Sequence, residues 1–228
     1  MKHLNLFESF SDINKICSWY SIKYYTINKD ESVDANGDVN LSGFKLGRLP
    51  VNFNSASGYF SCYNNRLMSL EGSPNFVGGD FNCSYNSLTS LKGGPKQVNG
   101  SFTCSFNKLT TLEGNIKYVS RHFFCNNNLI ESLEGSPKKI NGVFNCAGNN
   151  LTSLKGCPVY IGSNFECNNN QITTFEGFPK HVGGRFSCAY NPLYHIWILF
   201  ADITKIELFN DMDIIQDGVV ILDRLNFF

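Results

Sequence analysis

A 21-residue repeat runs through most of this 228-residue chain and constrains its fold more than any other feature. A phenylalanine recurs every 21 residues, a cysteine follows it by two positions and an asparagine by five. These are Phe60, Phe81, Phe102, Phe123, Phe144, Phe165 and Phe186; Cys62, Cys83, Cys104, Cys125, Cys146, Cys167 and Cys188; and Asn65, Asn86, Asn107, Asn128, Asn149, Asn170 and Asn191. A degenerate copy precedes them, with Val39, Leu41, Phe44, Leu46 and Leu49 in the same phase. Such register indicates a solenoid, in which each unit packs only on its neighbours.

Each unit is interpreted as one coil. The stretch Ser101-Phe102-Thr103-Cys104-Ser105 alternates polar and apolar residues, which predicts a short strand with Phe102 and Cys104 facing inward. Gly and Pro later in most units, such as Gly135 and Pro137, exclude a helix on the return path. We therefore predict a mainly β solenoid of about eight coils with a parallel sheet, whose strands lie ~4.8 Å apart. The asparagine amides are expected to satisfy backbone groups of their own coil and the next.

The repeat phrase Val-x-Gly-x-Phe-x-Cys-x-x-Asn-x-Leu-x-x-Leu-x-Gly-x-Pro resembles a leucine-rich repeat of the short bacterial class. The flanks, Tyr25-Thr26-Ile27-Asn28 at one end and Ile221 to Asn226 at the other, are similar to those of leucine-rich-repeat proteins of tailed bacteriophages. The resemblance covers essentially the whole chain. It implies a leucine-rich-repeat horseshoe or rod and a viral or bacterial source, and it carries over no activity residue by residue.

Both ends are expected to cap the rod, because a solenoid must cover its open apolar faces. We predict an N-terminal cap over residues 1–38, the solenoid over 39–193 and an α/β cap over 194–228. The first cap would hold a helix begun by Ser11 or Asp12, then a hairpin over 25–38 that turns at Asn36-Gly37. The second would hold a helix over 194–200 and strands over 206–209 and 219–222. The alternative for the second cap is an interaction role.

The pattern of cysteines predicts buried core residues rather than metal ligands or disulfides. No Cys-x-x-Cys pair is present, and thiols on consecutive strands form a line that does not surround a metal. Parallel Cβ vectors on neighbouring coils would hold the Cβ atoms too far apart for regular disulfides. The column is therefore expected to be reduced and buried. Cys17 and Cys157 lie outside it, and we place them in the cap and on the convex side. No metal and no cofactor is predicted.

No catalytic motif is present in the sequence. The histidines His3, His122, His181 and His195 stand in no His-Glu-x-x-His pattern, and no nucleophile elbow or phosphate loop is found. Asp34, Asn36 and Asp38 resemble half of a calcium loop, but the required Gly and distal Glu are misplaced, so a hairpin is favoured. We expect a protein that is not an enzyme.

The charge and the hydropathy of the chain give little support for nucleic acid or a membrane as a partner. The chain has 19 basic and 19 acidic side chains, which we expect to balance coil by coil. One column, Lys96, Lys117, Lys138 and Lys180, lies away from the strands, and four charges on a neutral protein are a weak indication of nucleic acid. The longest apolar run spans six residues, 196–201, and the N-terminus lacks the apolar segment of a signal peptide. These features predict no membrane contact and a cytoplasmic protein, in the host cytoplasm if it is phage-encoded.

Binding is the chemistry that remains. Residues that flank Phe and Cys would point outward on one strand face, and they vary while the core columns do not. Exposed aromatics anchor interfaces, although they also favour strands by themselves. We predict a monomer that binds a host or viral protein on this face, with inhibition of a host factor as its expected role. The alternative is a structural or adhesion component that recognises a surface glycan or a virion protein. The predicted contact residues are Tyr59, Tyr63, Asp80, Tyr85, Phe106, His122, Phe124, Glu166, Arg185 and Tyr190.

Overall fold

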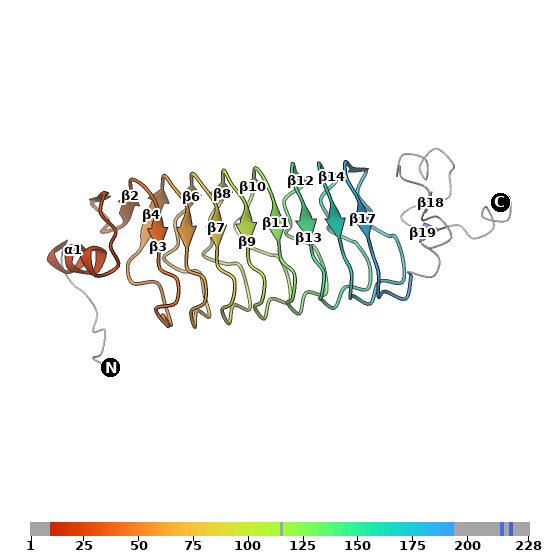
Figure 1. The fold of residues 1–228 in the computed structure, drawn as a ribbon, viewed down its shortest axis with the longest axis horizontal. Coiled ribbons are helices and arrows are strands. Elements are labelled where there is room, and N and C mark those ends of the chain that lie inside the picture. Colours follow the sequence, from red (N-terminus) through yellow and green to blue (C-terminus); the bar gives the residue numbers. More distant parts are fainter. Residues whose placement is uncertain (1–9, 115, 194–214, 217–218, 221–228) are drawn as a thin grey trace.

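The fold is a straight β-solenoid in which the coils stack along the long axis of a rod (Figure 1). This computed structural model describes residues 10–114, 116–193, 215–216 and 219–220. Its strands pair with a constant offset of 21 residues, as in the register of Phe60 with Phe81 and of Phe123 with Phe144. The predicted solenoid and its period are therefore confirmed.

The first sheet contains eight parallel strands, each of two residues, in chain order along the rod. Each of the seven strands after the first begins with the repeat phenylalanine, whose side chain points inward and is buried. The strands are β3 (Val39–Asn40), β5 (Phe60–Ser61), β7 (Phe81–Asn82), β9 (Phe102–Thr103), β11 (Phe123–Phe124), β13 (Phe144–Asn145), β15 (Phe165–Glu166) and β17 (Phe186–Ser187). Eight strands agree with the expected number of coils.

A second line of parallel strands runs beside the first and was not predicted. Six of these strands end at the valine or isoleucine that closes each unit, and the first two end at an alanine in the same phase. The strands are β2 (Val33–Ala35), β4 (Phe53–Ala56), β6 (Phe76–Val77), β8 (Gln97–Val98), β10 (Tyr118–Val119), β12 (Lys139–Ile140), β14 (Tyr160–Ile161) and β16 (His181–Val182). Each coil thus contributes two strands rather than one. The hydrogen-bonded ladder is interrupted between β10 and β12. The interruption follows the coil in which Ile116 replaces the usual proline.

The core consists of columns of identical side chains. Consecutive repeat phenylalanines lie 5.1–5.8 Å apart between ring centroids, within the range of favourable aromatic pairs. The cysteines and the paired leucines fill the rest of the interior. Burial of each such side chain contributes about 1.5–3 kcal/mol. Because every coil shares its apolar faces with both neighbours, the stability of the rod is a sum over contacts between coils.

A ladder of asparagine side chains joins successive coils. Asn149 Nδ2 donates to the carbonyl oxygens of Cys146 in its own coil and Cys125 in the preceding one, at 2.9 and 3.2 Å. Its Oδ1 accepts from the backbone N–H of Ile130, also in the preceding coil, at 3.0 Å. The same bonds recur at the other six asparagines. The ladder therefore reaches back to the preceding coil, where we had expected it to reach the next.

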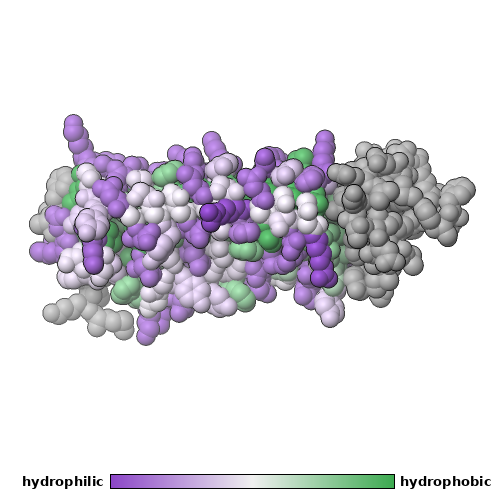
Figure 2. Space-filling view, turned by 45° about the horizontal axis from the view of Figure 1, so that its top comes forward, coloured by the Kyte–Doolittle hydropathy of each residue, from purple (hydrophilic) through white to green (hydrophobic). Residues whose placement is uncertain are grey.

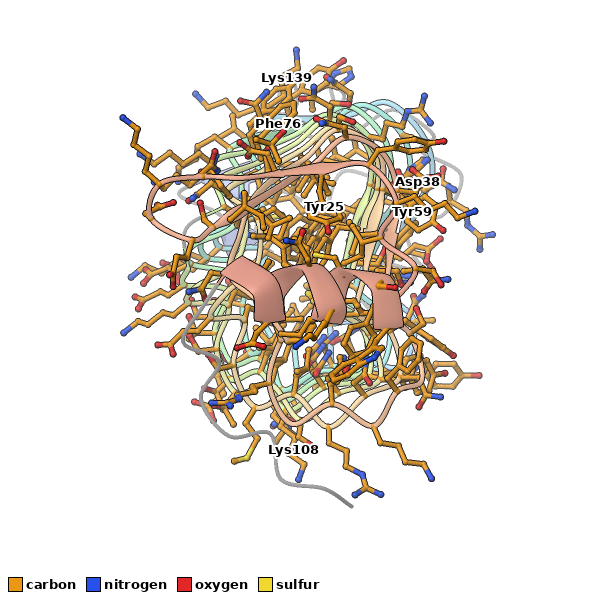
Figure 3. The ribbon with its side chains drawn as sticks, turned by 90° about the vertical axis from the view of Figure 1, so that its left-hand side faces the viewer. Tyr25, Asp38, Tyr59, Phe76, Lys108 and Lys139 are labelled. Carbon is orange, nitrogen blue, oxygen red and sulfur yellow. The ribbon has the colours of Figure 1, made fainter. Side chains whose placement is uncertain are left out.

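The N-terminal residues cover the first coil. Helix α1 (Phe10–Trp19) lies across the end of the rod (Figure 3), and Ile13, Ile16 and Cys17 on it are buried. The predicted helix thus exists, although Ser11 and Asp12 fall inside its first turn rather than ahead of it.

The predicted hairpin exists with a different turn. Strand β1 (Tyr25–Ile27) pairs antiparallel with β2, and the chain reverses over residues 28–32, where Glu31 has φ 64°. Asn36 and Gly37 instead form the corner that leads from β2 into β3, so their turn chemistry serves the solenoid.

The expected C-terminal helix over 194–200 and the strand over 206–209 lie outside the described residues. Within the predicted strand 219–222, the described part is β19 (Val219–Val220), which pairs antiparallel with β18 (Ile215–Gln216).

Asp34 fastens the hairpin to the first coil. Its carboxylate accepts hydrogen bonds from Ser55, Asn28 and Asn54. These bonds, that of Ser55 foremost, hold the pKa of Asp34 below its ordinary value. The carboxylate therefore stabilises the fold above the unfolded-state pKa, and this contribution is lost as the pH falls through the lower folded-state pKa.

We predict that Asp34→Asn lowers the free energy of unfolding by about 1 kcal/mol at neutral pH, because the new amide directs a donor at the donor of Asn28. The difference from the wild type should shrink in acid, as measured by urea unfolding across the acidic range. A difference that does not change with pH would contradict the role of the charge.

Adjacent asparagines offer a direct comparison for the ladder. Asn149→Ala removes both sets of bonds from a buried site and should lower the free energy of unfolding by about 3 kcal/mol. Asn150→Ala makes the same chemical change one residue away, at a half-buried side chain, and should cost less than about 0.5 kcal/mol. Urea unfolding of the two variants tests the ladder, and equal losses would contradict it.

Candidate functional site

Three aromatic side chains lie in the turns that directly follow strands β5, β7 and β9 of the first sheet, each in contact with the next. The rings of Tyr63 and Tyr85 meet edge to face at 5.3 Å, and those of Tyr85 and Phe106 stack at 4.3 Å. They come from three consecutive coils, and their exposed fractions are 37%, 45% and 42%. We call these three residues the ring stack. The structure thus brings together three of the ten predicted contact residues.

Two members of the ring stack occupy backbone positions that disfavour their side chains. Tyr85 and Phe106 both have φ 56°, in the left-handed region. The equivalent positions in the other coils are filled mostly by glycine or asparagine, which tolerate this conformation: Gly43, Asn64, Asn127, Gly148, Asn169 and, as the exception, Tyr190. An aromatic residue there costs about 1 kcal/mol. Folding alone therefore does not account for Tyr85 and Phe106.

Beside the ring stack lies a buried serine column that we had expected to face solvent. Ser84 and Ser105 directly follow their cysteines and are 3% and 5% exposed. The prediction that this column points outward is wrong for both, because the strands end at the residue before each cysteine and the chain then turns. Ser105 Oγ donates to Asn126, whereas Ser84 Oγ is buried with no hydrogen-bond partner among the described residues.

A second aromatic pair lies at β11, with His122 directly before the strand and Phe124 in it. His122 and Phe124 alternate on the same face with ring centroids 5.6 Å apart, and both side chains are half-buried. Tyr59 is 38% exposed on the same sheet face. The expected continuous strip is thus resolved into the ring stack, this pair and Tyr59.

Asp80 and His122 have structural roles that the sequence analysis missed. In alternate coils, the side chain before the repeat phenylalanine accepts the backbone N–H of the residue 21 positions later. Asp80 Oδ1 accepts from Ser101 at 2.7 Å, and His122 Nδ1 accepts from Val143 at 2.9 Å. Asp38 and Asn164 do the same for Tyr59 and Arg185.

Glycines make room for these acceptors. A Cβ at Gly100 would lie 2.2 Å from Asp80 Oδ1, and one at Gly142 would lie 2.5 Å from His122 Nδ1. Gly58 and Gly184 stand in the same relation to Asp38 and Asn164. The sequence contains a pattern that could have predicted these hydrogen bonds. Every 42 residues, an acceptor side chain stands before the repeat phenylalanine, and a glycine follows that acceptor by 20 residues.

The remaining predicted residues lie toward the last described coils. Glu166 and Arg185 line a polar hollow of about 260 Å³ with Asn164, Asn168 and Ser187. Glu166 accepts a hydrogen bond from Asn145 at 2.6 Å. Tyr190 is 78% exposed, in the same left-handed position as Tyr85 and Phe106. These residues form a separate region rather than an extension of the ring stack.

All nine cysteines are free and buried. Burial raises the pKa of the Cys62 and Cys188 thiols to about 12 and that of Cys17 to about 11. Cys157, which we had placed on the convex side, is 6% exposed and belongs to the core. Within residues 10–114 and 116–193, no three His, Cys, Asp or Glu side chains come together as a metal-binding group.

No protein-family model matches the chain, and no curated protein matches it by sequence. Among the described helices, none has the length and apolar character needed to cross a membrane.

The raised pKa values predict slow thiol chemistry in the native state, because the thiolate is the reactive form. Reaction with a disulfide reagent at pH 8 should be at least about 100-fold slower in the folded protein than in concentrated guanidinium chloride, where nine thiols should titrate. Rapid labelling of several thiols in the folded protein would contradict the burial of the column.

Proposed function

We propose that this protein is a non-enzymatic binding scaffold that engages a protein partner through the ring stack of Tyr63, Tyr85 and Phe106. The observation that carries the proposal is the presence of Tyr85 and Phe106 at left-handed positions where five of the six other coils have glycine or asparagine. Side chains kept at a cost to the fold are expected at functional sites. Exposed, clustered aromatics are also the residue type that anchors protein interfaces.

The arrangement of the rings favours a protein over a glycan. A sugar stacks on the open face of an aromatic ring, whereas Tyr85 and Phe106 stack on each other with an interplanar angle of 18°. Their edges and the adjoining polar columns remain available, and these suit the apolar and hydrogen-bonding groups of a protein surface. Surface glycans and virion proteins remain the alternative partners that the experiment below distinguishes.

The resemblance to phage leucine-rich-repeat proteins extends the proposal to a host or viral protein in the host cytoplasm, with inhibition of a host factor as the biological role. The nine free, buried thiols support a reducing compartment, since disulfides are rare in the cytosol. The rod would then present one rigid face to its partner.

The test replaces the aromatic residues with the residue that the fold prefers. Tyr85→Asn and Phe106→Asn together should leave the free energy of unfolding unchanged or raise it by about 1 kcal/mol, because they remove backbone strain. The same double variant should lose the protein that the wild type captures from infected-cell lysate. Affinity capture with mass spectrometry, and urea unfolding, measure the two effects.

Two controls sharpen the result. Tyr118→Asn removes a ring of similar exposure from the second sheet and should leave capture intact. Asp80→Ala removes a side-chain acceptor of a backbone N–H beside the first sheet and leaves the ring stack unchanged. It should lower the free energy of unfolding and leave the amount of captured protein unchanged. Capture that survives loss of both rings would overturn the proposal. Capture of a glycan instead of a protein would replace it with the alternative.

A further inference from the structure

The outer face of the second sheet is basic and free of acidic residues over six coils. The five residues centred on each strand valine or isoleucine, from 75–79 to 180–184, include no Asp or Glu. They include six cations: Lys96, Lys117, Arg121, Lys138, Lys139 and Lys180. All six are exposed, and none forms an ion pair within the described part of the chain. We call this surface the basic face.

The net charge of zero for the whole chain does not reveal the positive charge of the solenoid. Residues 39–193 contain 13 basic and 7 acidic side chains, and the flanks contain the compensating acids. The expected balance coil by coil is therefore wrong for the solenoid. Hydrophilic side chains project along the rod in Figure 2, where its top comes forward, and Lys139 points away from Asp38 and Tyr59 in Figure 3. Lys139 on the basic face and the first-sheet residues Asp38 and Tyr59 thus point to different sides of the rod.

The lysines form a line along the rod axis. Lys96, Lys117 and Lys138 occupy the same position in consecutive coils, and Lys180 follows two coils later. The backbone fixes the first of these steps, since Lys117 N–H donates to the Lys96 carbonyl at 2.9 Å, whereas the hydrogen-bonded ladder is interrupted at the step from Lys117 to Lys138. Four coil steps of ~4.8 Å span ~19 Å. That length accommodates about five phosphates at the ~3.4 Å spacing of one stacked DNA strand.

Planar rings occupy four of the six outward strand positions beside these charges: Phe76, Tyr118, Tyr160 and His181. Tyr118 is 47% exposed. Lys139 Nζ lies 4.9 Å from the centre of the Tyr160 ring, and Tyr160 stacks on His181 at 4.5 Å with an interplanar angle of 7°. Lysines that follow a backbone, together with aromatic rings on which bases stack, are the two parts of a site for single-stranded nucleic acid.

We propose that the basic face binds single-stranded nucleic acid, with its lysines on the phosphates and with the exposed ring of Tyr118 against a base. Charge complementarity selects a polyanion, and the exposed ring selects one that has unpaired bases. This activity is separate from the proposed function of the ring stack. A sulfated polysaccharide, which offers charge without bases, is the competing occupant.

The test measures binding of the full chain to a fluorescein-labelled 12-nucleotide single strand, as DNA and as RNA, by fluorescence anisotropy. With five phosphate contacts, the affinity should fall about 100-fold between 50 and 200 mM salt. Lys117→Gln, Lys138→Gln and Lys139→Gln combined should weaken binding and reduce this fall to about sevenfold. Tyr118→Ser should weaken binding about tenfold and leave the salt dependence unchanged.

Matched control variants distinguish binding at the basic face from a general effect of the positive charge of the protein. Lys45→Gln, Lys92→Gln and Lys108→Gln remove the same charge from exposed lysines elsewhere and should leave binding unchanged. Tyr85→Asn with Phe106→Asn should do the same, which keeps this proposal distinguishable from the proposed function. Absence of binding at 50 mM salt, or equal losses from both lysine triples, would overturn the proposal. Heparin that binds as tightly as the oligonucleotide, with both affinities unchanged by Tyr118→Ser, would also overturn it.

Discussion

The asparagine amide between successive coils is the interaction on which the rest of the rod depends. Each coil turns sharply after its cysteine, and the turn leaves backbone N–H and C=O groups that no strand can pair. One buried side chain satisfies three of them, two in the preceding coil and one in its own. The first coil has Phe44 at this position, and that side chain is 52% exposed. An asparagine is not needed at this position, because no earlier coil presents backbone groups for it to bond.

A ladder that fixes the register of the coils leaves the outward columns free to vary. Phenylalanine, cysteine and leucine positions repeat because they share one packed interior, whereas the two sheet faces carry different chemistry on the same scaffold. One face presents the ring stack, at a backbone cost. The other presents lysines that the neutral overall charge conceals. The rod thereby holds two surfaces in a constant relation, and each can be altered without disturbing the core.

The 21-residue period predicted the features that all coils have in common, and it missed the features that depend on the residues of individual coils. Seven copies of one pattern sufficed for the solenoid, its period and the buried columns of Phe60 and Cys62. The second sheet was missed because its outward residues, Phe76, Gln97, Tyr118 and Lys139 among them, share no residue type. Asp80 and His122 seemed to be surface residues because their hydrogen bonds involve backbone atoms one coil away. Ser84 seemed exposed because the strand ends sooner than alternation implies.

Native-state hydrogen exchange tests the central role of the ladder most directly. The amides of Leu46, Leu67, Leu88, Leu109, Ile130, Leu151 and Ile172 lie outside the strands and donate to an asparagine Oδ1. If the ladder holds the coils together, these amides should exchange as slowly as the strand amides of Phe102 and Phe123, and only through cooperative opening of the rod. Exchange at the rate of exposed turn amides, with the strands still protected, would contradict the account.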